Sequence, residues 1–243
     1  MLVFIVPYRN RQFHKTHFLK YMEYILEDYK KDDYEILIVN QNDNRLFNRG
    51  AMKNFGFIYV KQKYPDTYKN ITLIFNDIDT IPAEKNLLKY ETTTGNIKHF
   101  YGFDFCLGGI FSITAGDFEK INGFPNYWTW GLEDNTIYYR ANSNNINVDR
   151  SQFYKIGAME IIHSVDEIIK FKKKSLSTKT ELKNDKNGLN SLNSYTYNFD
   201  EINNMLNINT FNCGLPINKN DIQPIYINSK KKESVPRMGL IYN

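Results

Sequence analysis

Two pairs of acidic residues give the sequence its clearest chemical signal. Asp77 and Asp79 directly follow an apolar run, and Glu133 and Asp134 follow a Gly- and Pro-containing segment with two tryptophans. An Asp-x-Asp triplet at a strand end can hold Mn²⁺ or Mg²⁺ on a diphosphate, because these cations prefer oxygen ligands, although Asp is also common in ordinary turns. Acids beside flat aromatic rings are typical of a sugar site, although acids are also common in the first turn of any helix.

Basic, aromatic and imidazole side chains elsewhere could complete such a site. His163 ends a short apolar run, and imidazole binds Mn²⁺, although a lone histidine is more often a core or surface residue. The guanidinium fork matches phosphate oxygens, so three arginines are candidate phosphate or nucleotide contacts: Arg9, Arg11 and Arg49. Phe47 could stack on a base. Taken singly, each of these is compatible with an ordinary surface residue.

The expected secondary structure brings these residues to one edge of a sheet. Apolar runs and helical stripes alternate along the first part of the chain, at Leu2–Pro7, Phe13–Lys30, Tyr34–Val39, Arg49–Lys63 and Ile71–Phe75. Strands that alternate with helices predict an α/β fold, a Rossmann-like and mostly parallel sheet flanked by helices. Ligands bind beyond the carboxyl ends of such strands, so residues 8–11 and 77–79 are expected to be neighbours.

The rest of the chain predicts further elements and a mobile lid. Strands are expected around Gly108-Gly109, within Phe103–Thr114, and at Ala158–His163, with short helices at Ala115–Ile121 and Phe199–Leu206. The polar stretch 165–186 is expected to be a flexible loop, and its lysines are expected to form a solvated face. We expect one domain over 1–243, with a nucleotide-binding half at 1–82 and an acceptor and metal half at 100–228. The tail after Lys230 is expected to be loosely ordered.

Composition excludes some classes of function. The net charge of +4 is modest, so no nucleic-acid partner is expected. The two cysteines, Cys106 and Cys213, form no disulfide framework and favour a reducing compartment. No run approaches the roughly 18 apolar residues that span a bilayer, so no transmembrane segment is expected. The run at 1–6 lacks the leader and cleavage site of a signal peptide, which predicts a cytoplasmic protein.

Several blocks of the sequence, taken together, match a known pattern. They are PYRNR at 7–11, FNRGAMKNFGF at 47–57, FNDIDTIP at 75–82, GGIFSIT at 108–114 followed by FEKINGFPNYWTWGLED at 118–134, IIHS at 161–164 and NGLNSL at 187–192. In this order, the blocks resemble those of the β-1,4-galactosyltransferase family, glycosyltransferase family 7. The resemblance runs from about Val3 to Leu192, and NGFPNYWTWGLED is its most specific block.

The resemblance implies a GT-A fold and an activity. Family members invert the configuration of a hexose as they transfer it, typically galactose from UDP-galactose to a 4-hydroxyl of a saccharide acceptor in β-1,4 linkage. By position, the nucleotide-sugar contacts would be Pro7, Tyr8, Arg9, Arg11, Phe47, Arg49, Asp77, Ile78, Gly109 and Trp130. The Mn²⁺ ligands would be Asp79, His163 and Glu160. Asp134 would be the catalytic base, Glu133 would contact the donor sugar, and the acceptor would meet Trp130, Asp134 and Asn135.

This chain departs from the family pattern at several of these positions. Glu160 stands where a Met is common, and a harder ligand predicts that Mg²⁺ is tolerated beside Mn²⁺. Asn135 stands where further acids are usual, and Leu132 replaces a usual Gly. Cys106 stands where an aromatic often restricts the 2-substituent of the donor, and its smaller side chain leaves the donor sugar open between galactose and N-acetylgalactosamine.

Three classes of function are compatible with the sequence. The expected one is an active UDP-sugar-dependent glycosyltransferase. The others are a catalytically inactive nucleotide-sugar- or carbohydrate-binding protein of the same fold, and a basic nucleic-acid-binding module suggested only by lysine clusters. The lack of an anchor and of disulfides departs from Golgi enzymes. It predicts a bacterial or viral enzyme in the cytoplasm that builds surface polysaccharide, or one domain of a larger polymerase.

Overall fold

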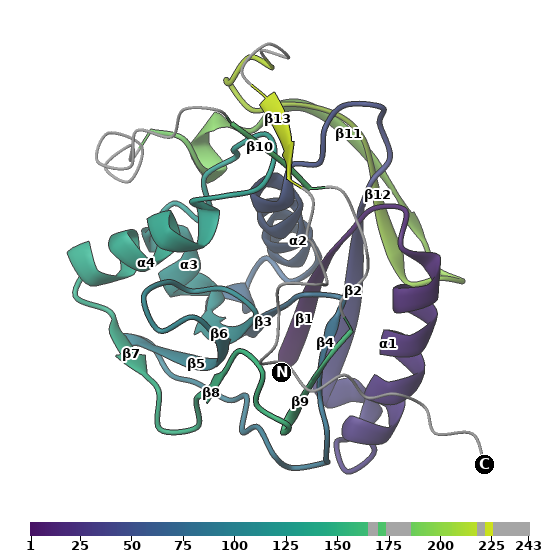
Figure 1. The fold of residues 1–243 in the computed structure, drawn as a ribbon, viewed down its shortest axis with the longest axis vertical. Helices are drawn as coiled ribbons and strands as arrows, with labels where there is room; N and C mark the ends of the chain where they lie inside the picture. The colour runs from purple at the N-terminus through teal and green to yellow at the C-terminus, as the bar shows by residue number, and fades with distance from the viewer. Residues whose placement is uncertain (165–169, 174–185, 218–221, 226–243) are drawn as a thin grey trace.

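The computed structural model describes residues 1–164, 170–173, 186–217 and 222–225. In these residues a mixed, nine-stranded sheet forms the centre of the protein, in the order β11-β12-β2-β1-β3-β6-β5-β7 with β8 paired to β5 (Figure 1). Its strands are β1 (Leu2–Tyr8), β2 (Tyr34–Gln41), β3 (Thr72–Asn76), β5 (Asn96–Gly102), β6 (Ile110–Thr114), β7 (Asn147–Asp149), β8 (Tyr154–Lys155), β11 (Asn193–Asp200) and β12 (Met205–Asn212).

The parallel part of the sheet agrees with the predicted α/β pattern. β1 runs parallel to both β2 and β3, and β12 runs parallel to β2. β6 runs antiparallel to β3 and β5, so the sheet is mixed but its centre is parallel. All seven residues of β1 are buried, as a central strand covered on both faces requires. The mostly parallel central sheet expected from the sequence is confirmed.

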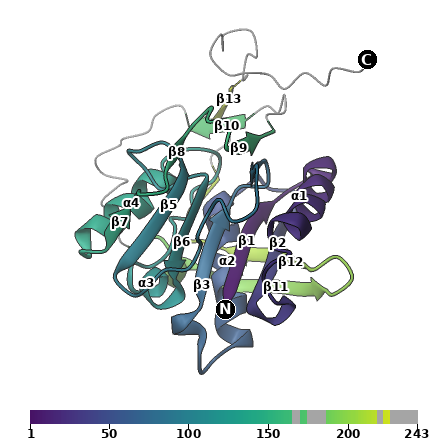
Figure 2. The ribbon, with the colours of Figure 1, turned by 90° about the horizontal axis from the view of Figure 1, so that it is seen from below.

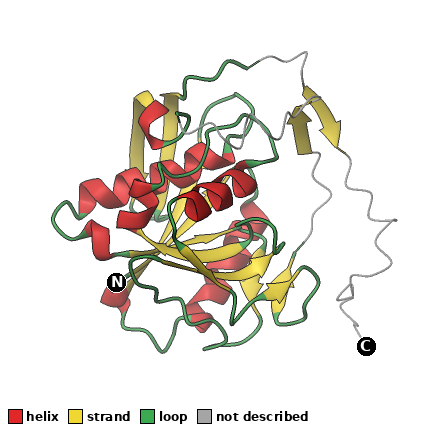
Figure 3. Cartoon of the chain, turned by 90° about the vertical axis from the view of Figure 1, so that its left-hand side faces the viewer, coloured by secondary structure: helices red, strands yellow, loops and turns green. Residues whose placement is uncertain are grey.

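Helices cover both faces of the sheet (Figure 3). They are α1 (Gln12–Ile25), α2 (Arg49–Lys63), α3 (Ala115–Lys120) and α4 (Glu133–Ser143), with 3₁₀ turns at Lys31–Asp33, Tyr68–Asn70 and Leu189–Ser191. Alternate side chains of β1 separate the two cores, since Phe4 packs with α1 and Ile5 packs with α2. Gly56 lets α2 approach closely, because a Cβ there would lie 2.5 Å from Cγ2 of Ile5.

The predicted helix at Phe199–Leu206 is wrong. The segment contains the turn of a hairpin in which β11 pairs antiparallel with β12, with Phe199 opposite Leu206. Phe199 stacks on Tyr59 of α2 at 5.1 Å, so alternate residues of the hairpin bury an apolar face against the helix. Asn204 takes a φ of 48°, which closes the turn. Figure 2 shows the hairpin beyond β2, at the opposite side of the sheet from β7.

Two small sheets lie outside the central one. β4 (Thr80–Pro82) pairs with β9 (Ile161–His163), and β10 (Lys170–Lys173) pairs with β13 (Ile222–Ile225). The strand expected over Ala158–His163 is therefore confirmed only at its end. Most of the predicted loop 165–186, and the tail after Lys230, lie outside the described residues, and the proposed domain halves stay a prediction. No helix among the residues that the structure describes is long and apolar enough to cross a membrane.

Candidate active site

The predicted site residues gather around one cavity of about 660 Å³ at the carboxyl ends of β1 and β3. This volume is in the range of small-molecule sites. The predicted residues that line the cavity are Pro7, Arg9, Arg11, Phe47, Arg49, Asp77, Ile78, Asp79, Gly109, Trp130, Asp134 and His163. Tyr8, Glu133, Asn135 and Glu160 do not line it. Residues that are up to about 150 positions apart in the chain thus meet at the edge that the strand pattern predicted.

Arg49 joins the two acidic pairs. It is the first residue of α2, which is capped by the side chain of Asn48 accepting from the amide of Ala51. Its Nη2 lies 3.2 Å from Oδ2 of Asp77 and 3.4 Å from Oδ2 of Asp134. Burial disfavours the charged guanidinium, but the surrounding carboxylates outweigh burial and raise the pKa of Arg49 further above its ordinary value. The acids of the site are therefore arranged around a permanent cation.

Glu133 and Asp134 form the first turn of α4. Leu132 precedes them with a φ of 66°, a left-handed conformation that explains why Gly is usual there. Glu133 is buried, and its carboxylate accepts from the amide of Gly131 at 2.9 Å. Burial, reinforced by Asp134 and opposed by Arg49, raises the pKa of Glu133 above its ordinary value.

Asp134 faces the cavity across the diglycine segment. The amide of Leu107 donates to the backbone carbonyl of Asp134 at 3.0 Å, which ties the start of α4 to the segment before β6. A Cβ on Gly108 would lie 2.6 Å from Oδ2 of Asp134, so only glycine admits the carboxylate at this position. Asp134 therefore combines access to the cavity with fixed backbone, which a general base requires.

Asp79 and His163 come together through the small β4–β9 sheet. Thr80 is paired with His163 in that sheet, and the amide of Ser164 donates to the carbonyl of Asp79 at 2.8 Å. A carboxylate and an imidazole at one corner of the cavity form a donor set that suits Mn²⁺. Nδ1 of His163 lies 3.0 Å from the hydroxyl of Tyr101, and such a contact orients a metal-binding imidazole.

Glu160 is not brought to this corner. Its backbone carbonyl accepts from the amide of Ala83, and its side chain is exposed and lies outside the cavity lining. Among the residues that the structure describes, no three His, Cys, Asp or Glu side chains form a group that could hold a metal. The part of Glu160 in metal binding therefore stays a prediction, as does the metal itself.

Two predicted nucleotide contacts have structural partners of their own. Both Nη atoms of Arg9 donate to backbone carbonyls, those of Asp43 and Arg45, and so hold the loop after β2. Tyr8 is buried, and its hydroxyl contacts the side chain of Gln12. Phe47 is better placed to meet a ligand, because it lines the cavity and its carbonyl accepts from the amide of Thr129 beside Trp130. The indole of Trp130 is 45% exposed at the rim.

The sequence did not single out three residues that support the site, namely Lys53, Tyr101 and His99. Arg150 donates from Nε to Nδ1 of His99 at 3.1 Å, so Nε2 carries the ring proton. Nε2 lies 3.1 Å from the carbonyl of Gly108 and 3.2 Å from that of Tyr101, so the imidazole fixes the backbone beside Asp134. Burial lowers the pKa of His99 to about 4, which keeps the ring neutral. The sequence predicts no strand or motif around His99, so nothing in the sequence signalled this role.

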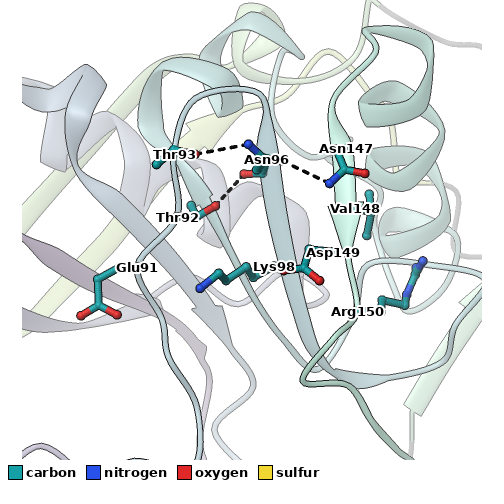
Figure 4. Close-up of a pocket in the computed structure, with 9 residues that line it drawn as sticks. All are labelled: Glu91, Thr92, Thr93, Asn96, Lys98, Asn147, Val148, Asp149 and Arg150. Carbon is teal, nitrogen blue, oxygen red and sulfur yellow. Dashed lines mark hydrogen bonds between the residues drawn. The ribbon is translucent and has the colours of Figure 1, made fainter.

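A second hollow, of about 500 Å³, lies along β5 and β7 (Figure 4). Its lining includes Glu91, Lys98 and Asp149, and none of the predicted site residues. Three hydrogen bonds join lining residues, from Thr92 to the carbonyl of Asn96, from the side-chain amide of Asn96 to Thr93, and from the side-chain amide of Asn147 to that of Asn96. The chemistry expected from the sequence is therefore confined to the larger cavity.

Two family models match consecutive parts of the chain. The one described as the N-terminal region of glycosyl transferase group 7 matches residues 1–91, and the one described as the N-terminal domain of galactosyltransferase matches residues 91–164. The matched region includes the cavity edge, both acidic pairs and His163. The chain belongs to glycosyltransferase family 7, in agreement with the resemblance noted in its sequence.

Curated relatives agree with this assignment. The chain is 35% identical over 173 residues to beta-1,4-galactosyltransferase 1 of Bos taurus, a match that covers 67% of this chain and 42% of the relative. It is 32% identical over 158 residues to xylosylprotein 4-beta-galactosyltransferase of Caenorhabditis elegans, a match that covers 61% of this chain and 53% of the relative. The chain spans about half the length of the curated relatives it matches.

Solved structures share the fold. The crystal structure of the catalytic domain of Drosophila beta1,4-galactosyltransferase 7 with xylobiose aligns with a TM-score of 0.69 and 24% identity, over 90% of this chain and 96% of that one. A variant of the same enzyme, in complex with manganese, UDP-Gal and xylobiose, aligns with a TM-score of 0.68 and 23% identity, with the same coverage. At this identity the likeness establishes the GT-A-type fold.

The expectation of a cytoplasmic bacterial or viral enzyme is wrong. Relatives that the chain matches include animal galactosyltransferases of Mus musculus, Caenorhabditis elegans and Drosophila melanogaster. The cytoplasmic prediction rested on the two cysteines and on the lack of a leader, and these relatives overturn it.

Proposed function

We propose that this chain transfers galactose from UDP-galactose to a hydroxyl of a saccharide acceptor, with inversion at the anomeric carbon and in β-1,4 linkage. The observation that carries the proposal is the meeting of Asp134, Asp77 and Arg49 in one cavity, where one carboxylate oxygen of each acid lies within 3.4 Å of the guanidinium. Relatives of 32 to 35% identity named as galactosyltransferases support it.

In this proposal Asp134 is the base. Its carboxylate takes the proton from the acceptor hydroxyl, while the hydroxyl oxygen attacks the anomeric carbon from the face opposite the UDP. The carbon–oxygen bond to the diphosphate breaks as the new glycosidic bond forms, so one displacement gives inversion. No covalent sugar–enzyme intermediate is needed, and Glu133, which is buried beside the base, serves the donor sugar.

The other side of the cavity serves the leaving group. Arg11 and Arg49 line the cavity, and their guanidinium groups are suited to bind the departing diphosphate. A divalent cation at Asp79 and His163 would neutralise charge on the same group. We propose Mn²⁺ as the cation, because an imidazole ligand favours it, and we retain Mg²⁺ as a weaker alternative.

The proposal also concerns the identity of the donor sugar and of the acceptor. Cys106 lines the cavity at the position expected to restrict the 2-substituent of the donor, and its side chain is small. We therefore propose that UDP-N-acetylgalactosamine is also accepted. Xylobiose occupies the similar structures of the Drosophila enzyme, and a β-xyloside is a first acceptor to test beside N-acetylglucosamine.

The test is a transfer assay on the purified chain with Mn²⁺ or Mg²⁺, either UDP-sugar and either acceptor, with product linkage determined by NMR. We expect a β-linked product with Mn²⁺ and UDP-galactose. Asp134→Asn is expected to lower kcat by at least about 100-fold, the size of a general-base contribution, while UDP-galactose binding measured by calorimetry persists. Binding without turnover in the unaltered chain would favour the alternative, an inactive nucleotide-sugar-binding protein.

A further inference from the structure

Lys53 is a buried lysine that contacts the proposed base. It lies one turn after Arg49 on α2, so both side chains leave the same face of the helix. Its Nζ lies 3.3 Å from Oδ1 of Asp134, whereas Arg49 Nη2 lies 3.4 Å from Oδ2. Two cations from successive turns of one helix therefore hold the two oxygens of one carboxylate.

The burial of Lys53 makes this contact unusual. Its side chain is 1% exposed, and Nζ lies 4.3 Å from the ring centroid of Phe124, which is itself fully buried. A charged ammonium is costly to bury unless it is paired, because the interior solvates it poorly. In the part of the chain that the structure describes, the carboxylate of Asp134 is the acid that forms an ion pair with it.

The two cations differ in their access to ligands. Arg49 lines the cavity, is 16% exposed and also contacts Asp77 and Glu133. A bound diphosphate can therefore compete with these carboxylates for its guanidinium. Lys53 does not line the cavity, so no ligand there can draw it from Asp134. Lys53 is the partner that the base keeps when the donor is bound.

We propose that Lys53 is a positioning residue for Asp134, a fixed buried cation that orients the carboxylate toward the acceptor hydroxyl after the donor has engaged Arg49. This inference rests on the proposed function, since it assigns Asp134 the role of base.

The kinetic test compares Lys53→Met with Lys61→Met. Lys61 is on the same helix, is 46% exposed and pairs with Glu119 away from the cavity, so it is a matched control. Lys53→Met keeps the length of the side chain and removes the charge. We expect kcat to fall about 10- to 100-fold, because a misplaced base costs this much, while the KM for UDP-galactose stays within about threefold. Lys61→Met is expected to leave both unchanged.

If Lys53 had only a structural role, Lys53→Met would not lower kcat while leaving the KM for UDP-galactose nearly unchanged. If Lys53→Met lowered kcat and donor affinity together, or left kcat within about threefold of the unaltered chain, the proposal would be overturned. Lys53→Arg retains the cation, and it is expected to keep more of kcat than Lys53→Met does.

A stability measurement separates this inference from the proposed function and does not need activity. Asp134→Asn leaves the Lys53 ammonium buried without its anion, and is expected to lower the melting temperature. Adding Lys53→Met in the same chain removes that ammonium, and is expected to restore part of the loss. If the melting temperature of the double variant fell by the sum of the losses in the two single variants, the pairing of Lys53 with Asp134 would be contradicted. If the unaltered chain transfers no sugar, the proposed function fails, while this measurement still decides whether the pair exists.

Discussion

Nη1 of Arg11 lies 3.1 Å from Oδ2 of Asp79. The arginine proposed for the diphosphate is thus paired with the carboxylate proposed for the metal, and both side chains are largely buried, at 18% and 15% exposed. A cation that binds Oδ2 of Asp79 would compete with Arg11, and a diphosphate that binds Arg11 would release this oxygen. We therefore expect the pair to couple the binding of donor and metal.

Arg11→Gln is expected to strengthen the binding of Mn²⁺ in the absence of nucleotide. Removing a partly buried ion pair leaves Asp79 free for the metal, which corresponds to a gain of about twofold to tenfold in affinity. The affinity for UDP is expected to fall, because a guanidinium contact to phosphate is lost. Electron paramagnetic resonance of free Mn²⁺ and calorimetry with UDP measure the two effects. Lys63→Gln, which removes an ion pair with Glu35 outside the cavity, is the control; unchanged Mn²⁺ affinity in Arg11→Gln would show that the pair does not compete with metal.

Tyr101→Phe is expected to weaken Mn²⁺ binding by about tenfold, because partners that orient a metal-binding histidine contribute this much. Burial raises the pKa of Tyr101 to about 12, so the hydroxyl is protonated at neutral pH and stays hydrogen-bonded to His163. The ring of Tyr101 is buried, and Phe preserves its packing. Titration of Mn²⁺ measures the effect, and circular dichroism checks the fold. An unaltered metal affinity would remove Tyr101 from the metal corner.

The stability of the protein is expected to fall as the pH drops from about 6.5 toward about 4, in part because of His99. Its pKa is lowered from 6.5 to about 4 by burial, so the unfolded chain binds a proton in this window and the folded chain does not. At roughly 1.4 kcal/mol per pKa unit, the contribution is about 3 kcal/mol, complete above pH 6.5 and lost below pH 4. Urea unfolding across this range should show a shallower decline for His99→Gln. Parallel declines in the two proteins would contradict a neutral, buried His99.

Leu132→Gly is expected to stabilise the protein by about 1 kcal/mol, because Leu132 holds a left-handed φ of 66° that costs a non-glycine residue about this much. The greater entropy of glycine in the unfolded chain reduces the gain. Thermal unfolding measures it, and Leu132→Ala, which retains a Cβ, is the control. A lower melting temperature for Leu132→Gly than for Leu132→Ala would mean that the side chain, rather than the backbone, decides the stability of this turn.

The centre of the fold could be predicted because its strands are continuous apolar runs. The predicted strands at Leu2–Pro7, Tyr34–Val39 and Ile71–Phe75 agree closely with β1, β2 and β3. The edge strands β4, β7 and β8 have two or three residues each, which is too short for any periodicity. The hairpin of β11 and β12 was missed because the apolar residues around its turn also fit a helical spacing.

The residues of the cavity could be predicted where they lie inside the contiguous sequence blocks that resemble the family. Asp77, Asp79 and Asp134 lie inside such blocks. The role of Lys53 could not be predicted, because a lysine within a helical pattern usually faces solvent. Its burial depends on tertiary contacts such as the one with Phe124. Arg9 shows a different limit of the sequence: its type suits phosphate and it lines the cavity, but the sequence did not show that its Nη atoms donate to backbone carbonyls of the loop after β2. Its contact with the nucleotide stays a prediction.

The pairing of β4 with β9 has a consequence for chelation. Main-chain hydrogen bonds of this small sheet place Asp79 and His163 at one corner of the cavity. We therefore expect the corner to form without a cation and EDTA to leave the fold intact. Binding of the proposed cation would then be reversible and would follow folding, unlike the case of a zinc finger, whose folding depends on its ion.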